Sequence, residues 1–224
     1  MDYNINYIQK MAQDLGLYEN INISECEIDE YIGKICDRYD FSYNTGISKL
    51  VIKPKDTDYV IKIPFARYYD EETDNFYSFH CYGCRGWNAC EFEEELYNKA
   101  HNAKFEQFFL PIELACVCNN YPIYVQPKAD IINEKRDSFY YLKPTIKTNK
   151  ILDDNYIDTM SKLVEGWFDI INKELGEERF LDFLHFLNKY DISSDLHEGN
   201  VGMYHGKPVI IDYAGFERKE EEED

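Results

Sequence analysis

Two aspartates and an asparagine lie close together in the segment 195–212. The run Asp195-Leu-His-Glu-Gly-Asn200 comes first, and Asp212 directly follows an apolar run that ends at Ile211. Mg2+ prefers hard oxygen ligands and keeps several waters, so Asn200 and Asp212 suit it when phosphate oxygens complete the site. The remaining acid, Asp195, can accept a hydroxyl proton. These residue types predict metal-assisted phosphate transfer. The alternative is an ordinary polar loop whose Asp caps a helix.

A short β-hairpin must position these side chains. The sequence predicts strands over 201–204 and 207–211, joined by His205-Gly206, whose glycine suits a tight two-residue turn. Asn200 precedes the first strand and Asp212 follows the second. A hairpin therefore brings both residues to one edge.

Hydrophobic periodicity predicts the other elements. Apolar steps of three and four residues between 2 and 38 indicate two amphipathic helices, and alternation between 41 and 65 indicates strands. The strands are predicted over 49–53 and 59–63, with a turn over 54–58 between them, and are followed by an irregular stretch over 66–90. A helix with Phe92, Leu96 and Ala100 on one face comes next, and then strands over 112–117 and 123–126. Two helices, over 156–175 and 178–188, are divided by Gly176. The fold class is α+β, with a strand-rich lobe before a helical one.

The hairpin segment resembles the protein-kinase-like superfamily. It is closest to the atypical branch, which includes aminoglycoside phosphotransferases and kinase-like proteins of bacteria and phages. Residues 195–200 are similar to the Asp-Leu-His-x-x-Asn catalytic loop of those phosphotransferases. Asp212-Tyr-Ala-Gly215 stands where the family has Asp-Phe-Gly, with one residue inserted. The resemblance implies Asp195 as the catalytic base, and Asn200 and Asp212 as ligands of Mg2+.

Weaker pieces of the same resemblance lie upstream. The run 59–63 is similar to the family's Val-Ala-Ile-Lys strand, which implies that Lys62 contacts the phosphates of ATP and takes part in catalysis. The family pairs this lysine with a helical glutamate. Glu93 fits that role, and Glu94 stays open because only helix phase separates the two residues. The alternatives are a surface lysine and a solvated helix face.

Two further segments would contact the nucleotide in such a fold. Gly46 and Ser48 stand where the phosphate-covering loop belongs, with one glycine where the family usually has three. Gln126 would lie beside the adenine, and Pro127, which follows it, has no N–H to donate. The resemblance thus implies ATP and Mg2+ as cofactors.

The resemblance also implies a two-lobed protein-kinase-like fold. Its expected parts are an N-terminal helical extension over 1–40, an N-lobe with a small antiparallel sheet over 41–127 and a Cys-containing insertion at 66–90, a reduced and mainly helical C-lobe over 128–216, and an acidic tail over 217–224. The segment 128–175, together with the few residues beyond Gly215, is expected to supply the room for the acceptor.

Three departures leave the activity open. Ser193-Ser194 replaces the family's His-Arg or His-Gly before Asp195, the glycine loop is poor, and no activation segment is expected because the sequence ends at Asp224. The expected reaction transfers the γ-phosphoryl group of ATP to a hydroxyl of a protein or a small molecule. The alternatives are a pseudokinase that binds nucleotide or a protein partner, and AMP transfer on the same fold.

A cysteine-containing cluster offers a possible structural zinc site. The candidate ligands are His80, Cys81, Cys84 and Cys90, to which Cys116 and Cys118 could add. Zinc ribbons normally show two paired cysteine knuckles, and the chain has one pair of that spacing. Free cysteines are therefore the favoured interpretation.

The composition limits the classes of partner. The chain of 224 residues carries 43 Asp and Glu against 24 Lys and Arg, a formal charge of −19, which disfavours nucleic acid and favours a basic or neutral partner. No run of eighteen apolar residues occurs, so no membrane partner is expected. Seven cysteines, an odd number, favour a reducing cytoplasm over a disulfide scaffold.

Overall fold

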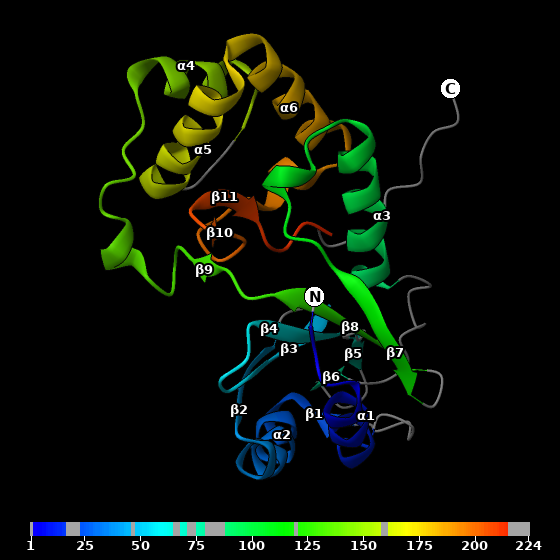
Figure 1. Ribbon diagram of the computed structural model, residues 1–224. Coiled ribbons are helices and arrows are strands. Elements are labelled where there is room, and N and C mark those ends of the chain that lie inside the picture. Colours follow the sequence, from blue (N-terminus) through cyan, green and yellow to red (C-terminus); the bar gives the residue numbers. More distant parts are fainter. Residues whose placement is uncertain are drawn as a thin grey trace. The chain divides into compact units, whose positions relative to one another are not determined.

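The computed structural model of the chain (Figure 1) describes residues 2–16, 23–45, 48–64, 68–70, 75–78, 88–118, 121–157 and 161–214. Within these residues the fold is α+β, with antiparallel sheets and six α-helices. The chain divides into two compact units. The first consists of Met1–Glu94 and Pro111–Lys128, and the second of Glu95–Leu110 and Ala129–Asp224.

A five-stranded antiparallel sheet forms the centre of the first unit. In spatial order its strands are β2 (Phe41–Thr45), β3 (Lys49–Pro54), β4 (Tyr59–Pro64), β8 (Tyr121–Pro127) and β7 (Glu113–Cys118). Every neighbouring pair is antiparallel. The strands predicted between 41 and 65 are confirmed, as are the two predicted over 112–117 and 123–126.

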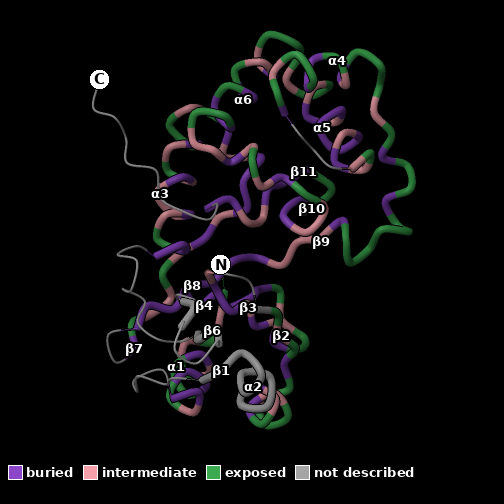
Figure 2. Tube along the Cα trace, turned by 180° about the vertical axis from the view of Figure 1, so that it is seen from behind, coloured by how far each residue is buried: buried purple, intermediate pink, exposed green. Residues whose placement is uncertain are grey.

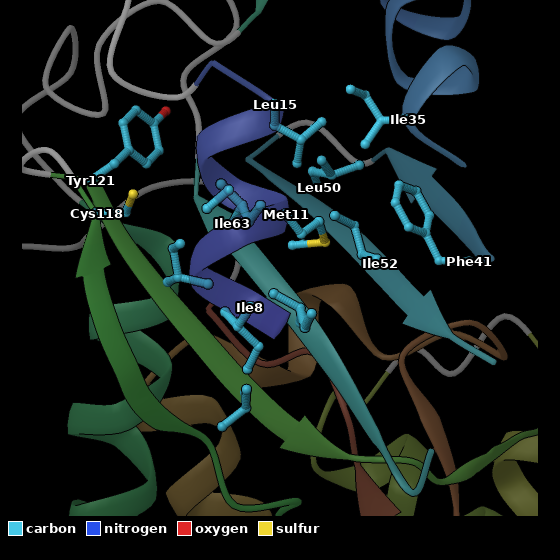
Figure 3. Close-up of a cluster of buried hydrophobic side chains, with 14 of the residues drawn as sticks. Ile8, Met11, Leu15, Ile35, Phe41, Leu50, Ile52, Ile63, Cys118 and Tyr121 are labelled. Atoms are coloured by element: carbon cyan, nitrogen blue, oxygen red, sulfur yellow. The ribbon is translucent and has the colours of Figure 1, made fainter. Parts of the chain in front are cut away.

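One face of this sheet packs against two helices, α1 (Ile5–Asp14) and α2 (Glu25–Tyr39), which confirms the two amphipathic helices expected before residue 38. Side chains alternate between the faces of a strand, so every second residue of β3 and β4 enters this core. Figure 3 shows the core, whose members include Ile8, Met11, Leu15, Ile35, Leu50, Ile52, Ile61 and Ile63. The opposite face therefore receives the intervening residues, including both lysines described below.

The stretch expected to be irregular over 66–90 contains two short strands, so that prediction is wrong for part of it. β5 (Tyr68–Asp70) and β6 (Asn75–Ser78) pair with each other, and β6 also pairs with β1 (Ile23–Ser24). Both strands carry tyrosine or phenylalanine, which favour pleated backbone, but they are too short to show a clear period. The helix α3 (Ala89–Asn102) follows and contributes residues to both units.

The second unit is mainly helical. Its further elements are the 3-10 helices η1 (Glu106–Phe108), η2 (Arg136–Phe139) and η3 (Ile192–Asp195), the helices α4 (Ile146–Asp154), α5 (Lys162–Leu175) and α6 (Glu177–Lys189), and the strands β9 (Asp130–Ile131), β10 (Val201–Tyr204) and β11 (Lys207–Ile210). Figure 2 shows that β10 and β11 are largely buried.

The helix predicted over 156–175 begins later than expected. α4 ends at Asp154, and Tyr156 has a φ of 59°, which an α-helix does not allow. Ser161 then caps α5 by accepting a hydrogen bond from the backbone N–H of Leu163 at 3.2 Å. Gly176, with a φ of 76°, separates α5 from α6 as predicted, and α6 confirms the helix expected over 178–188.

In the described part of the chain, no helix is long and apolar enough to cross a membrane.

Candidate functional site

The predicted hairpin is present in the second unit. β10 and β11 pair antiparallel from Val201 opposite Ile210 to Tyr204 opposite Lys207. The connecting residues His205 and Gly206 have φ values of 50° and 77°, as a type I′ turn requires. β11 ends at Ile210, one residue earlier than predicted.

A side chain of α5 and the backbone of β9 hold this hairpin in place. Trp167 of α5 is fully buried, and its indole N–H donates to the carbonyl oxygen of Gly202 at 3.0 Å. A β-carbon on Gly202 would lie 2.5 Å from the carbonyl oxygen of Asp130, so only glycine allows β9 this close. The hairpin is therefore a fixed support for the loop that precedes it.

Asp195 and Asn200 contact each other across this loop. The Asn200 side-chain N–H2 donates to the backbone carbonyl and to the carboxylate Oδ2 of Asp195, both at 2.9 Å. Asn200 is buried, with 8% of its surface exposed. These hydrogen bonds fix the orientation of the Asn200 amide, so that its Oδ1 is the atom that can coordinate a cation. His197 adds a ring nitrogen 3.7 Å from Oδ1 of Asp195.

Backbone bonds bring Asp212 to the same loop. The carbonyl oxygen of Asn200 accepts from the N–H of Ile211 at 2.7 Å and from that of Asp212 at 3.4 Å. The next residue, Tyr213, is buried, and its hydroxyl donates to the carbonyl oxygen of Leu110 at 2.9 Å. The structure thus places all three residues that the sequence selected around one hydrogen-bonded loop. Gly215, the last residue of that motif, lies outside the described residues.

The donor set fits Mg2+. An amide oxygen of Asn200 and a carboxylate of Asp212 are hard ligands, and Mg2+ commonly takes one or two protein groups while water and phosphate complete its shell. Among the residues that the structure describes, no group of three or more His, Cys, Asp or Glu gathers as a metal site. A Mg2+ site of the expected kind would not need one, because nucleotide oxygens would supply part of it.

A serine directly before Asp195 stabilises the turn that precedes the loop. Ser194 donates from its hydroxyl to the carbonyl oxygen of Asp191 at 2.8 Å. Asp191 itself has a left-handed backbone conformation, with a φ of 58°. Asp191 thus precedes the 3-10 helix η3, which ends at Asp195.

The second group of candidates lies in the first unit, where Glu93 is the partner of Lys62. Lys62 Nζ lies 2.8 Å from Oε2 of Glu93, and both side chains are almost fully buried. The structure therefore favours Glu93 over Glu94 as the paired acid. Glu94 is partly exposed, and burial raises the pKa of its carboxyl group with help from the neighbouring charges of Glu91 and Glu113.

The position of Glu93 is set by the start of α3. Asn88 accepts at its Oδ1 from the backbone N–H groups of Cys90 and Glu91, at 3.0 and 3.2 Å, and so caps the helix. Its N–H2 group donates to the hydroxyl of Tyr124 in β8 at 3.0 Å. One side chain thus both begins the helix and attaches it to the sheet.

A second lysine, which sequence reasoning missed, contacts the same glutamate. Lys49 Nζ lies 2.5 Å from Oε1 of Glu93, and the Lys49 side chain is 4% exposed. The alternation of side chains along a strand is the feature of the sequence that could have identified Lys49. Lys49 is two residues before Val51, which stands opposite Lys62 in the sheet, so both lysines lie on one face. A lysine on a strand is normally expected to face solvent, and only the pairing register of the strands shows that this one is buried.

The structure says less about the remaining residues that the sequence predicted to contact the nucleotide. Ser48 is half-buried and directly precedes β3, whereas Gly46 lies outside the described residues. Gln126 is fully buried in β8, opposite Val60. Lys128 donates to the carbonyl oxygens of Pro54 and Thr57 at 2.8 Å each. Contacts of Ser48 and Gln126 with a nucleotide stay predictions.

Of the zinc candidates, the structure describes Cys90 and the pair Cys116 and Cys118. Cys90 is fully buried beside Ile112 and Tyr124. Burial raises the thiol pKa of both Cys116 and Cys118, which disfavours the thiolate that zinc needs. The other candidates, His80, Cys81 and Cys84, lie outside the described residues, so the zinc site stays a prediction.

A pocket of about 710 Å3 opens in the second unit. It is lined by residues of η2, the start of α5 and the loop before β10, namely Arg136, Asp137, Tyr140, Ser161, Lys162, Leu163 and Glu198. Glu198 accepts a hydrogen bond from Ser161 and lies 3.7 Å from Arg136. Because Glu198 belongs to the run 195–200, the pocket is bounded by the same loop as the candidate base.

Comparison with known proteins adds no family assignment. No protein-family model, curated protein or solved structure matches the chain. The resemblance to the kinase-like superfamily therefore rests on the motifs in the sequence.

Proposed function

We propose that the protein is an ATP- and Mg2+-dependent phosphotransferase with a two-lobed kinase-like fold. The observation that carries the proposal is the buried contact between Lys62 and Glu93 at 2.8 Å. The sequence singled out Lys62 and left Glu93 and Glu94 as alternatives for its partner, which lies 31 positions away in the case of Glu93. A five-stranded antiparallel sheet with α3 between β4 and β8 in chain order also supports a kinase-like N-lobe.

Each candidate residue has a role in this reaction. Lys62 would bind the phosphates of ATP, held in place by Glu93. Asn200 and Asp212 would hold Mg2+, which offsets the negative charge of the phosphate oxygens when it is bound. Asp195 would accept the proton of the acceptor hydroxyl as its oxygen bonds to the γ-phosphorus and the bond from that phosphorus to ADP breaks.

The pocket bounded by Glu198 supports an acceptor close to Asp195. Most of its lining comes from 136–163, within the segment 128–175 that was expected to supply such room. Acidic and basic side chains both line it, so it suits a polar acceptor. The proposal covers a hydroxyl on either a small molecule or a protein segment.

The substitution Asp195→Asn tests the assignment of the base. The amide can still contact Asn200 but cannot take up a proton, so we expect nucleotide binding to persist while transfer falls about 10²–10⁴-fold. The matched control is Asp182→Asn, a carboxylate on α6 that pairs with Arg179 at the surface. Rates are measured as ATP turnover by the purified protein.

The product distinguishes the alternatives. Intact-mass measurement of the acceptor, or of the protein itself if it modifies its own chain, shows a phosphate in the proposed reaction and an AMP group in the alternative. A wild-type protein that binds ATP but gives no turnover would be a pseudokinase. Equal turnover of wild type and Asp195→Asn would contradict the role given to Asp195.

A further inference from the structure

Two lysines from neighbouring strands share one buried glutamate in the first unit. Lys49 of β3 and Lys62 of β4 contact opposite oxygens of the Glu93 carboxylate, at 2.5 and 2.8 Å. The three side chains are 4%, 2% and 0% exposed. Lys62 thus shares the carboxylate of Glu93, one of the two partners that the sequence left open for it, with a second lysine.

The sheet register explains why both lysines reach this carboxylate. Val51 stands opposite Lys62, and Lys49 is two residues before Val51 on the same strand. Residues two apart share a face, so Lys49 and Lys62 leave the sheet on one side. The apolar neighbours Leu50 and Ile63 enter the helix-covered core on the other side.

The arrangement of these side chains suits an anionic ligand. Two ammonium groups share the carboxylate of Glu93, in a chain whose total charge is −19. Removing charged groups from water is costly, and a structural ion pair needs only one lysine. Ammonium groups are common phosphate binders in proteins. A pair of them fixed by one carboxylate matches a ligand with adjacent phosphate groups.

We propose that Lys49 is a second phosphate-binding residue, which acts with Lys62 on the polyphosphate chain of a nucleoside di- or triphosphate. This inference rests on the proposed function, because it assigns Lys49 to the same nucleotide. Glu93 is then a positioning residue that fixes both ammonium groups. A ligand with a single phosphate, such as AMP, lacks the adjacent phosphate and gains little from the second lysine.

Acylation of the wild-type protein tests this directly. The probe is an ATP derivative with an acyl group on its terminal phosphate. The amine of a lysine beside the polyphosphate attacks the acyl carbon, an amide forms and ATP leaves. Peptide mass spectrometry then locates the amide. We expect ATP-protectable acylation at Lys49 as well as Lys62, with Lys53 of the same strand as the internal control.

The outcomes separate the two proposals. Acylation of Lys62 alone, with Lys49 at the level of Lys53, overturns the role of Lys49 and leaves the proposed function intact. Absence of ATP-protectable acylation at both lysines contradicts the nucleotide site itself. Because the experiment uses the unaltered chain, its result does not depend on whether a variant folds.

Lys49→Met provides the second measurement. The substitution keeps most of the side-chain volume and removes the charge, so we expect ATP affinity to fall about tenfold or more while AMP affinity changes much less. Lys53→Met is the matched control and should bind ATP like the wild type. Equal losses for ATP and AMP, or no loss for ATP, would show that Lys49 has only a structural role.

Discussion

At the scale of single residues, the account depends on one carboxylate. Glu93 and Glu94 are adjacent in the sequence, and their composition and charge pattern do not distinguish them. Helix phase does, because α3 begins at Ala89 and turns Glu93 onto the sheet toward Lys62. The candidate residues that belong to a recognisable motif could be singled out from the sequence. Lys49 could not, because its role depends on the strand register.

The pair Glu93→Gln and Glu94→Gln tests this distinction. Glu93→Gln leaves two buried ammonium groups without their carboxylate, and we expect a loss of about 3–5 kcal/mol in the free energy of unfolding. Burial raises the pKa of Glu94, so its ionised form disfavours the folded state above that pKa. Glu94→Gln should therefore be neutral or slightly stabilising at pH 7, with its advantage lost in acid.

Urea unfolding followed by circular dichroism measures both variants at pH 7 and at low pH. A similar stability of Glu93→Gln and wild type would mean that the ion pairs contribute nothing to the fold.

At the scale of elements, the hairpin of β10 and β11 is the part that the sequence predicted best. Alternating apolar residues and the turn His205-Gly206 specify both strands and their register, because a two-residue turn allows one pairing. The interval between α4 and α5 was predicted poorly. Apolar spacing continues from Ile151 past Tyr156, and only the local backbone there shows that the first helix has ended.

The glycine of this hairpin gives a prediction about close packing. In Gly202→Ala the new β-carbon would lie 2.5 Å from the carbonyl oxygen of Asp130, so β9 and β10 must separate. We expect a loss of about 1–3 kcal/mol in the free energy of unfolding. Gly33→Ala in α2 is the opposite case, because no atom lies within 4 Å of the added carbon. That helical position should gain about 0.5–1 kcal/mol.

Thermal and urea unfolding of both alanine variants check this contrast. If Gly202→Ala were as stable as the wild type, the hairpin would not be fixed by β9 as described.

At the scale of the whole molecule, net charge and local charge act in opposite directions. A chain of charge −19 repels a polyanionic nucleotide at long range, more strongly at low salt. The proposed binding therefore needs local positive charge, which Lys49, Lys62 and Mg2+ would supply. Composition predicted the repulsion. The placement of the lysines came only from the folded sheet.

The most direct test of the central claim is calorimetric titration of the wild-type chain with ATP, in excess Mg2+ and in EDTA. The account predicts binding in Mg2+ that weakens strongly in EDTA. It also predicts that Asp212→Ala loses the Mg2+-dependent part and that Lys62→Met loses affinity under both conditions. Absence of ATP binding by the wild type, or equal affinity with and without Mg2+, would contradict the proposed phosphotransferase.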